Sequence, residues 1–204
     1  MTKLRDFRNN LKAGEVYRRE DLEKLSKSVD RHLKELLEEA VLVKLSQGLY
    51  YMPKVSVFGK TPPDETALVT AFLKEKRFLL TSLNAYNSLG VGTTQLYNER
   101  MVYNHKRHEV VKLGNRTFNF KKRPDFPLKA SQEFLLVDLV NNLDQLSEDQ
   151  NDILERVKTK VVLMNRTQMK RSLTRFGNVK TKKLFMPLLN QIPIKSTKSI
   201  CTTT

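Results

Sequence analysis

The sequence predicts an α+β protein, with a small amino-terminal module of helices and a hairpin, then a mixed second domain whose carboxyl-terminal end is helical. Three observations indicate this class. Apolar residues recur at helical spacing in residues 1–40, β-prone runs with glycine turns follow in two places, and helical periodicity returns after residue 130. With 39% hydrophobic and 29% charged residues among 204, the chain has the composition of a globular protein with a buried core.

The amino-terminal module starts with two short helices. Gly14 interrupts the apolar pattern of the first, and the second is expected over residues 18–25. Ser28 then precedes a third helix over residues 29–40, because its hydroxyl can accept a free amide hydrogen of the first turn. The apolar residues of the first two helices are Leu4, Phe7, Leu11, Leu22 and Leu25.

The third helix is predicted to be amphipathic. At about 100° per residue, its apolar side chains fall in one arc centred near Leu33. The predicted buried face consists of Val29, Leu33, Leu36, Leu37 and Ala40. The predicted outer face consists of Arg31, Lys34, Glu35 and Glu38.

A hairpin completes the module. Residues 41–45 and 49–52 are β-prone runs joined by Ser46, Gln47 and Gly48, and Pro53 ends the unit. Three helices followed by a hairpin are typical of a winged helix-turn-helix, in which the third helix enters the major groove of DNA and the hairpin flanks the duplex. Residues 1–53 are therefore predicted to form a DNA-binding domain.

The charges on the third helix give evidence both for and against DNA binding. Lys27, Arg31 and Lys34 cluster at its amino-terminal half, where groove contacts are usually made. Glu35 and Glu38 argue against strong DNA binding, because phosphates repel them. A winged helix that binds protein is the alternative.

Residues 53–61 are predicted to be a linker, and residues 62–190 a second α+β domain. Its first helix opens on Pro62, Pro63, Asp64 and Glu65, which suit a helix amino terminus. Gly114 and Asn115 are predicted to form the two-residue turn of a hairpin. The remaining predictions are strands at 78–80, 100–104, 109–113 and 116–121, helices at 81–89, 130–146, 149–164, 166–176 and 179–189, and a disordered tail over 191–204.

The charge of the chain favours a polyanionic partner. Lys and Arg number 37 against 22 Asp and Glu, a net charge of +15, and no carboxylate side chain occurs after Glu155. In residues 166–176, Met169, Leu173 and Phe176 share one helical face. Basic residues around them are predicted to contact phosphates or an acidic protein: Lys170, Arg171, Arg175, Lys180, Lys182 and Lys183.

Signals for catalysis, cofactors and metals are lacking, so the sequence predicts no enzyme. The adjacent Asp64 and Glu65 fit helix-start electrostatics better than acid–base chemistry. His105 and His108 lack the companions of a metal site, and Cys201 stands alone. No apolar stretch is long enough for a membrane span, so a cytoplasmic location is expected.

Three segments give the chain a resemblance to the AbiEi family of antitoxins: residues 47–54 (QGLYYMPK), 81–91 (TSLNAYNSLGV) and 110–121 (VVKLGNRTFNFK). The similarity extends over about residues 1–190 and lies in the order of elements and in short hydrophobic and glycine signatures. The positions that match the family's DNA-reading elements are Ser28, Arg31 and Lys34 on the third helix and Lys44, Ser46 and Gln47 on the hairpin.

The resemblance implies an antitoxin that binds operator DNA as a transcriptional autorepressor. It also implies that the second domain counteracts a nucleotidyltransferase-like toxin, without a stable complex between the two proteins. A basic RNA-binding or ribosome-associated protein with a structural winged helix is the alternative. The sequence does not specify an oligomeric state.

Overall fold

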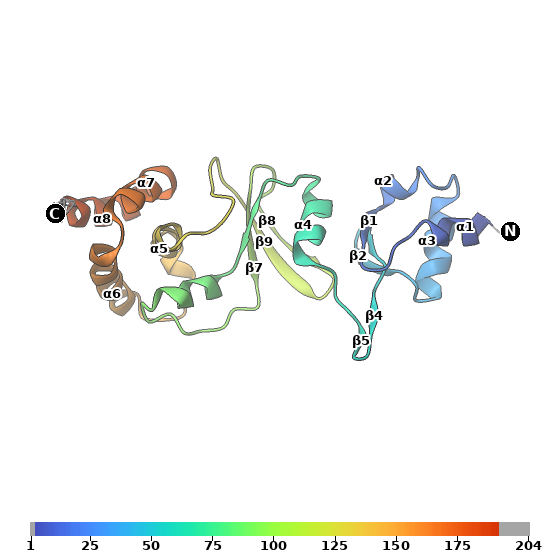
Figure 1. Ribbon diagram of the computed structural model, residues 1–204, viewed down its shortest axis with the longest axis horizontal. Helices are drawn as coiled ribbons and strands as arrows, with labels where there is room; N and C mark the ends of the chain where they lie inside the picture. Colours follow the sequence, from blue (N-terminus) through green and yellow to red (C-terminus); the bar gives the residue numbers. More distant parts are fainter. Residues whose placement is uncertain (1–2, 192–204) are drawn as a thin grey trace, which may run out of the picture. The chain divides into compact units, whose positions relative to one another are not determined.

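The protein has an α+β fold with a helical carboxyl-terminal end (Figure 1), which a computed structural model describes over residues 3–191. The chain divides into two compact units. The first combines residues 1–81 with residues 98–128, and the second combines residues 82–97 with residues 129–204. Of the tail predicted over residues 191–204, only Gln191, the last residue of a helix, lies within the described residues.

The first unit contains four helices and nine strands among its described residues, and it includes the whole amino-terminal module. Its first half contains α1 (Lys3–Asn9), β1 (Val16–Arg18), α2 (Arg19–Leu22), α3 (Val29–Glu38), β2 (Val43–Ser46), β3 (Leu49–Tyr51), β4 (Val55–Ser56) and β5 (Gly59–Lys60). Its second half contains α4 (Glu65–Leu73), β6 (Leu79–Thr81), β7 (Arg100–Asn104), β8 (Glu109–Leu113) and β9 (Arg116–Lys122).

These strands form three sheets. β1, β3 and β2 form an antiparallel sheet in that order, and β4 and β5 form a two-stranded antiparallel sheet. The third sheet has the order β6-β7-β9-β8, in which β7 and β9 are parallel and the other pairs are antiparallel. The predicted turn at Gly114 and Asn115 is confirmed, since it joins β8 to β9.

Strand β3 separates the two hydrophobic cores of the first unit. Tyr50 faces the core beneath α3, together with Phe7 and Leu22. Its neighbours Leu49 and Tyr51 belong to the other core, which also holds residues of α4 and of the sheet β6-β7-β9-β8. Because successive side chains of a strand point to opposite faces, β3 is buried on both sides.

This shared core explains why the units differ from the predicted boundaries. The predicted end of the first domain, residue 53, lies inside the first unit. Leu45 packs with Leu113 and Phe118 in one core, and the amide of Gly114 donates a hydrogen bond to the carbonyl of Leu45 (2.8 Å). The amino-terminal module and the four-stranded sheet therefore form one packed body.

The third helix is present but shorter than predicted, ending at Glu38 rather than at Ala40. Ala40 adopts a positive φ of 52°, and the amides of Val41 and Leu42 both donate to the carbonyl of Leu36, which closes the helix. Ser28 occupies the N-cap position, but its side chain accepts no capping hydrogen bond.

The buried face of α3 is also rotated from the predicted one. Val29, His32, Leu33 and Leu36 are buried, whereas Leu37 is half-buried and Ala40 is exposed. The imidazole of His32 packs against the ring of Phe7 at a tilt of 48°, with ring centroids 5.2 Å apart, which extends the buried arc to the His32 side.

Two further differences concern strands. Residues 16–18 form β1, and the second helix, predicted over residues 18–25, extends only over the four residues of α2. Residues 53–61, predicted to be a linker, contain the β4–β5 hairpin, which projects from the unit beyond the carboxyl-terminal end of α3 (Figure 1). Neither element has a clear signal in the sequence. β1 is a short strand at the edge of its sheet, where it pairs with β3, and the turn of the β4–β5 hairpin lacks the Asn-Gly pair that marks many hairpins.

The second unit is built around α5 (Gln132–Asn141), whose six consecutive residues 134–139 are all buried. The short 3-10 helix η2 (Leu143–Gln145) follows α5 in the chain. A helix that is apolar almost all round belongs in a core, and α5 contacts four other helices of its unit. Its neighbours are η1 (Leu83–Leu89), α6 (Gln150–Leu163), α7 (Arg166–Phe176) and α8 (Val179–Gln191).

Candidate nucleic-acid interface

The proposed DNA-contacting face of α3 is open to solvent. The side chains of Arg31 and Lys34 are 66% and 78% exposed, and Lys27 and Ser28 are exposed just before them. On the opposite side of the helix, Leu33 and Leu36 are completely or almost completely buried. The amphipathic helix predicted from the sequence therefore presents these four polar residues outward.

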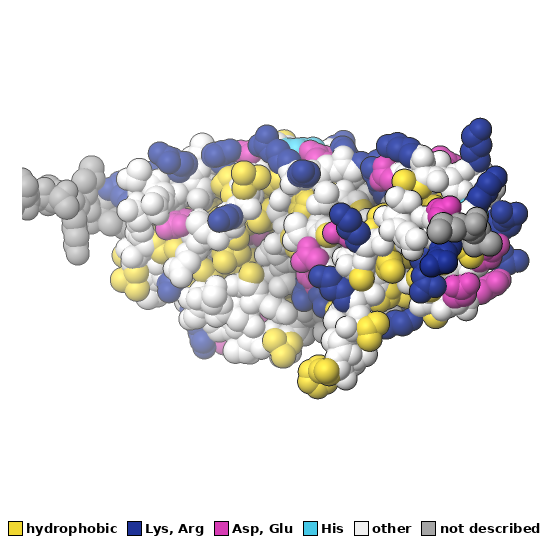
Figure 2. All heavy atoms as spheres, turned by 45° about the vertical axis from the view of Figure 1, so that its right-hand side comes forward, with side chains coloured by type: hydrophobic (Ala, Val, Ile, Leu, Met, Phe, Trp, Pro, Cys, Tyr) yellow, Lys and Arg dark blue, Asp and Glu magenta, His cyan; other side chains and the backbone are white. Residues whose placement is uncertain are grey.

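Ion pairs neutralise this face. Arg31 lies 3.7 Å from Glu35, and Lys34 lies 3.9 Å from Glu38, both one helical turn apart. Residues 27–38 hold three cations and three carboxylates, so their formal charges cancel. Figure 2 shows basic and acidic side chains intermingled over the amino-terminal helices. Because exposed pairs of this kind contribute little stability, a phosphate can displace either carboxylate at small cost.

Arg19 joins α3 to the turn of the β2–β3 hairpin. Its guanidinium donates to both oxygens of Asp30 (2.7 and 2.6 Å) and also pairs with Glu23. Its backbone amide donates to the carbonyl of Gly48 (2.9 Å). The hydrogen bond from Arg19 holds the pKa of Asp30 below its usual range. Arg19 was not among the predicted site residues, because its partner Asp30 lies eleven residues away and on another helix.

The predicted hairpin residues lie on β2 and its turn. Lys44 and Gln47 are exposed and Ser46 is half-buried, at a bulge between Lys44 and Ser46. Between them, Leu45 points into the core that the hairpin shares with α4. The β2–β3 hairpin is thus held against the unit and offers only its exposed edge and turn to a partner.

The second group of predicted contacts lies in the second unit. Arg171 and Arg175 on α7 and Lys180 and Lys183 on α8 are exposed, while Lys170 and Lys182 are half-buried. Met169 and Leu173 are buried on the opposite side of α7, and the predicted third member of that face, Phe176, is half-buried. Lys170 donates to the Asn190 side chain (3.1 Å), and the Arg175 guanidinium lies 5.1 Å from the centre of the Phe176 ring.

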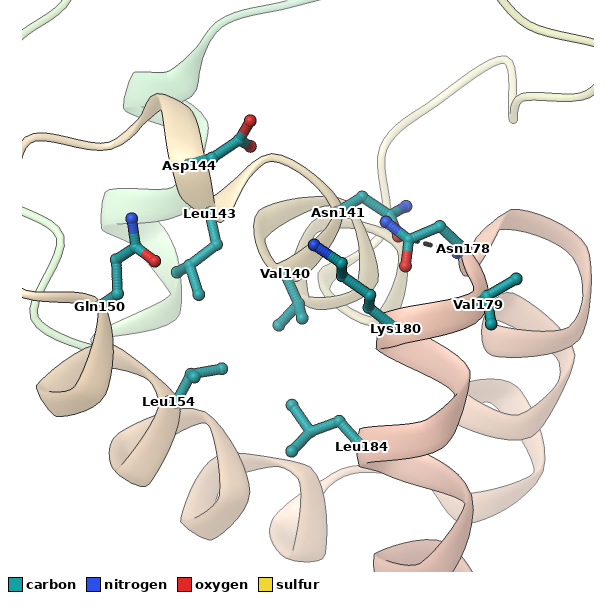
Figure 3. A pocket seen from close by; sticks show the side chains of 10 residues that line it. All are labelled: Val140, Asn141, Leu143, Asp144, Gln150, Leu154, Asn178, Val179, Lys180 and Leu184. Carbon is teal, nitrogen blue, oxygen red and sulfur yellow. Dashed lines mark hydrogen bonds between the residues drawn. The ribbon is translucent and has the colours of Figure 1, made fainter.

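A hollow of about 670 Å³ opens between α5, α6 and α8 of the second unit (Figure 3). Its floor is apolar, and Lys180 is the one predicted contact residue that reaches its rim. Asn141 on α5 accepts the backbone amide of Asn178 (2.9 Å), which joins α5 to the start of α8 at one side. Leu143, Leu154 and Leu184 converge on its centre, so the hollow offers apolar contact.

The hydrogen-bond networks of the second unit are structural. The Tyr86 hydroxyl donates to Asp138 Oδ2 (2.8 Å) within the buried core around α5, and Asn142 donates to both residues. Glu148 accepts the amides of Thr94 and Gln95; burial opposes ionisation of Glu148, but these bonds outweigh it and lower its pKa. Over residues 3–191, no three metal-ligating side chains gather in one place, and no helix is long and apolar enough to cross a membrane.

Comparisons with known proteins place the fold and the family. The chain is similar to the crystal structure of the RV2827C protein from Mycobacterium tuberculosis, with a TM-score of 0.56 and 14% identity, over 92% of this chain and 74% of that one. No curated protein matches it. Residues 8–173 match a family described as a family of unknown function (DUF6088). Since this match extends over most of the sequence, the chain belongs to the DUF6088 family.

Proposed function

We propose that this protein is a cytoplasmic DNA-binding autorepressor that contacts operator DNA through the outer face of α3. The observation that carries the proposal is the exposure of Arg31 and Lys34 on a helix whose other side is buried. Arg19 bonds both to Asp30 at the start of this helix and to Gly48 in the β2–β3 turn, so one residue joins the two predicted DNA-reading elements.

The electrostatics of the chain fit a duplex partner. Its net charge of +15 attracts a polyanion at long range, whereas the face of α3 is neutral as a whole. Electrostatic attraction of this kind does not depend on the DNA sequence, and it weakens as the salt concentration rises. Arg31 and Lys34 can then exchange their carboxylate partners for bases or phosphates.

The antitoxin part of the proposal rests on the resemblance to AbiEi antitoxins. We infer that the chain counteracts a nucleotidyltransferase-like toxin encoded beside it. The segment 81–91, one of the three that carry the resemblance, contains η1 and its glycine cap, and η1 packs against α5. A neighbouring reading frame for a nucleotidyltransferase is the expected genetic context.

A mobility-shift assay with the chain's own upstream promoter tests DNA binding. Arg31→Ala is expected to weaken binding by about 1 to 3 kcal/mol and to relax specificity at one base pair, if Arg31 reads a guanine. Lys112→Ala is the matched control, because Lys112 is an exposed cation of the same unit on β8.

Two results separate the roles of Arg31. Equal weakening on all duplexes shows that Arg31 contacts phosphate rather than a base. If both Arg31→Ala and Lys34→Ala bind as Lys112→Ala does, the α3 face is not the interface and the proposal fails.

RNA binding is the second candidate, and one observation favours it. Residues 156–191 contain ten Lys and Arg and no carboxylate side chain, unlike the neutral face of α3. Competition distinguishes the candidates: displacement of promoter DNA only by a large excess of unrelated duplex supports the repressor. Preferential displacement by folded RNA supports the RNA-binding protein.

A further inference from the structure

The β4–β5 hairpin ends in two apolar side chains that contact almost nothing in the chain. Val55 pairs with Lys60 and Ser56 with Gly59, so Val57 and Phe58 form the two-residue turn. These two residues are 94% and 98% exposed. Figure 2 shows hydrophobic side chains at the end of this projection. Hairpin turns usually carry polar residues or glycine, so an apolar tip on a projecting hairpin marks an interaction site.

The hairpin is ordered by its own hydrogen bonds. The Ser56 hydroxyl donates to the carbonyl of Gly59 (3.0 Å) and accepts the amide of Phe58 (3.2 Å). At the base, the amide of Thr61 donates to the carbonyl of Lys54 (2.9 Å). The apolar tip is therefore held by a hydrogen-bonded two-stranded hairpin rather than by an irregular loop.

A lysine attaches the hairpin to the proposed DNA-binding helix. Lys60 Nζ donates to the carbonyl of Ala40 (2.6 Å), two residues after the last residue of α3. An ammonium has three donors, so Lys60 keeps two for a partner. Both the hairpin and α3 belong to the first unit, and this bond places the base of the hairpin near the carboxyl-terminal end of α3.

The chemistry of the hairpin selects the partner. Residues 53–61 contain two lysines and no carboxylate side chain, so the partner is anionic. The tip is narrow and apolar, so the partner also offers an apolar interior behind its charged surface. Double-stranded DNA has both features in its minor groove, where phosphates border a base stack that Phe and other apolar side chains enter. A membrane fits less well. Even a single acyl chain attached to a protein gives only marginal membrane binding, and the two side chains of the tip bury less apolar surface than an acyl chain does.

We propose that the β4–β5 hairpin is a minor-groove wedge: Phe58, with Val57 beside it, inserts between base pairs next to the groove that α3 reads. Lys54 and Lys60 meet the bordering phosphates. Insertion unstacks one base step and bends the duplex away from the wedge. This inference rests on the proposed DNA-binding function and adds to it a second contact and a bent complex.

The test uses the full chain and a duplex of its upstream promoter with a fluorescence donor and acceptor at the two ends. Wild-type protein is expected to shorten the distance between the ends. Phe58→Ser is expected to lower affinity by roughly 10-fold, because it removes the main apolar contact, and to abolish the shortening. Phe58→Leu keeps an apolar wedge and is expected to retain most of the bend.

Leu128→Ser is the matched control, since Leu128 is an apolar residue of the same unit that is also well exposed. It is expected to leave affinity and bending unchanged. If Arg31→Ala weakens binding while Phe58→Ser behaves as Leu128→Ser does, the wedge is wrong and the DNA-binding function stands. If wild-type protein binds no duplex, both are wrong.

Lipid is tested with vesicles of phosphatidylcholine and phosphatidylserine in a 3:1 ratio. The wedge predicts no flotation of the chain with these vesicles. Flotation that Phe58→Ser abolishes, together with unchanged DNA bending, assigns the tip to a membrane and overturns the proposal.

Discussion

The β2–β3 and β4–β5 hairpins are neighbours in the sequence and use similar residues for opposite purposes. In the first, Leu49 and Tyr51 enter one core and Tyr50 enters the other, so the strand is buried on both sides. In the second, Val57 and Phe58 are almost fully exposed. Apolar residues at one hairpin hold the unit together, and those at the other are free for a partner.

The contrast shows why burial has to be known before an apolar hairpin is assigned a role. The β2–β3 hairpin was the predicted DNA-flanking element, yet four of its side chains, Leu45, Leu49, Tyr50 and Tyr51, belong to the cores. The β4–β5 hairpin, predicted to be a linker, is the one that projects. Three predictions on stability sharpen this division.

The largest expected effect is that of Leu49→Ala. Leu49 is 3% exposed in the core shared with α4, so its truncation leaves a cavity and is expected to lower the free energy of unfolding by about 2 to 5 kcal/mol. Urea denaturation followed by circular dichroism measures the change. Phe58→Ala is the control from the other hairpin and is expected to stay within about 0.5 kcal/mol of wild type. Equal losses of unfolding free energy in both variants contradict the conclusion that only the β2–β3 hairpin holds the unit together.

A smaller effect is expected for Tyr51→Phe, which tests the connection between the hairpins. The Tyr51 hydroxyl donates to the carbonyl of Pro62 (3.2 Å), just after the residue that closes the base of the β4–β5 hairpin. The Tyr51 hydroxyl also lies 3.5 Å from the hydroxyl oxygen of Thr61. Removing these contacts while keeping the ring is expected to lower the free energy of unfolding by about 1 kcal/mol, measured by denaturant unfolding. No loss at all shows that the hydroxyl does not support the second hairpin.

The sequence predicted the regular elements well and the cores poorly. Strands 100–104 and 109–113 and helix 166–176 have the predicted bounds. The first-unit core was missed, because Leu45 and Leu113 lie far apart in the sequence and no local pattern announces their contact. The sequence of α5, with six consecutive buried residues, predicted a helix but did not indicate that this helix lies at the centre of the second unit.

For the candidate site, the sequence predicted which residues of α3 are exposed, but not the contacts that join α3 to other elements. Arg31 and Lys34 point outward as predicted, since helical spacing fixes direction. Their carboxylate partners also follow from spacing, because Glu35 and Glu38 lie four residues on. The bond from Lys60 to Ala40 joins residues twenty apart, and only the folded chain reveals it.

The smallest expected effect is that of Asp30→Asn, which weakens the support that α3 and the β2–β3 turn share through Arg19. The pKa of Asp30 is lowered in the folded chain by its hydrogen bond from Arg19, so its ionised form stabilises the fold. That contribution is fully present above the unfolded pKa of about 4 and disappears as pH falls through the lower, folded value. Thermal melts at several pH values are therefore expected to show a small deficit for Asp30→Asn at neutral pH that vanishes in acid. Because the pair is exposed, high salt is expected to reduce the deficit as well. A deficit that persists in acid shows that Asp30 acts through something other than its charge, and it removes Arg19 as the electrostatic connection between α3 and the β2–β3 hairpin.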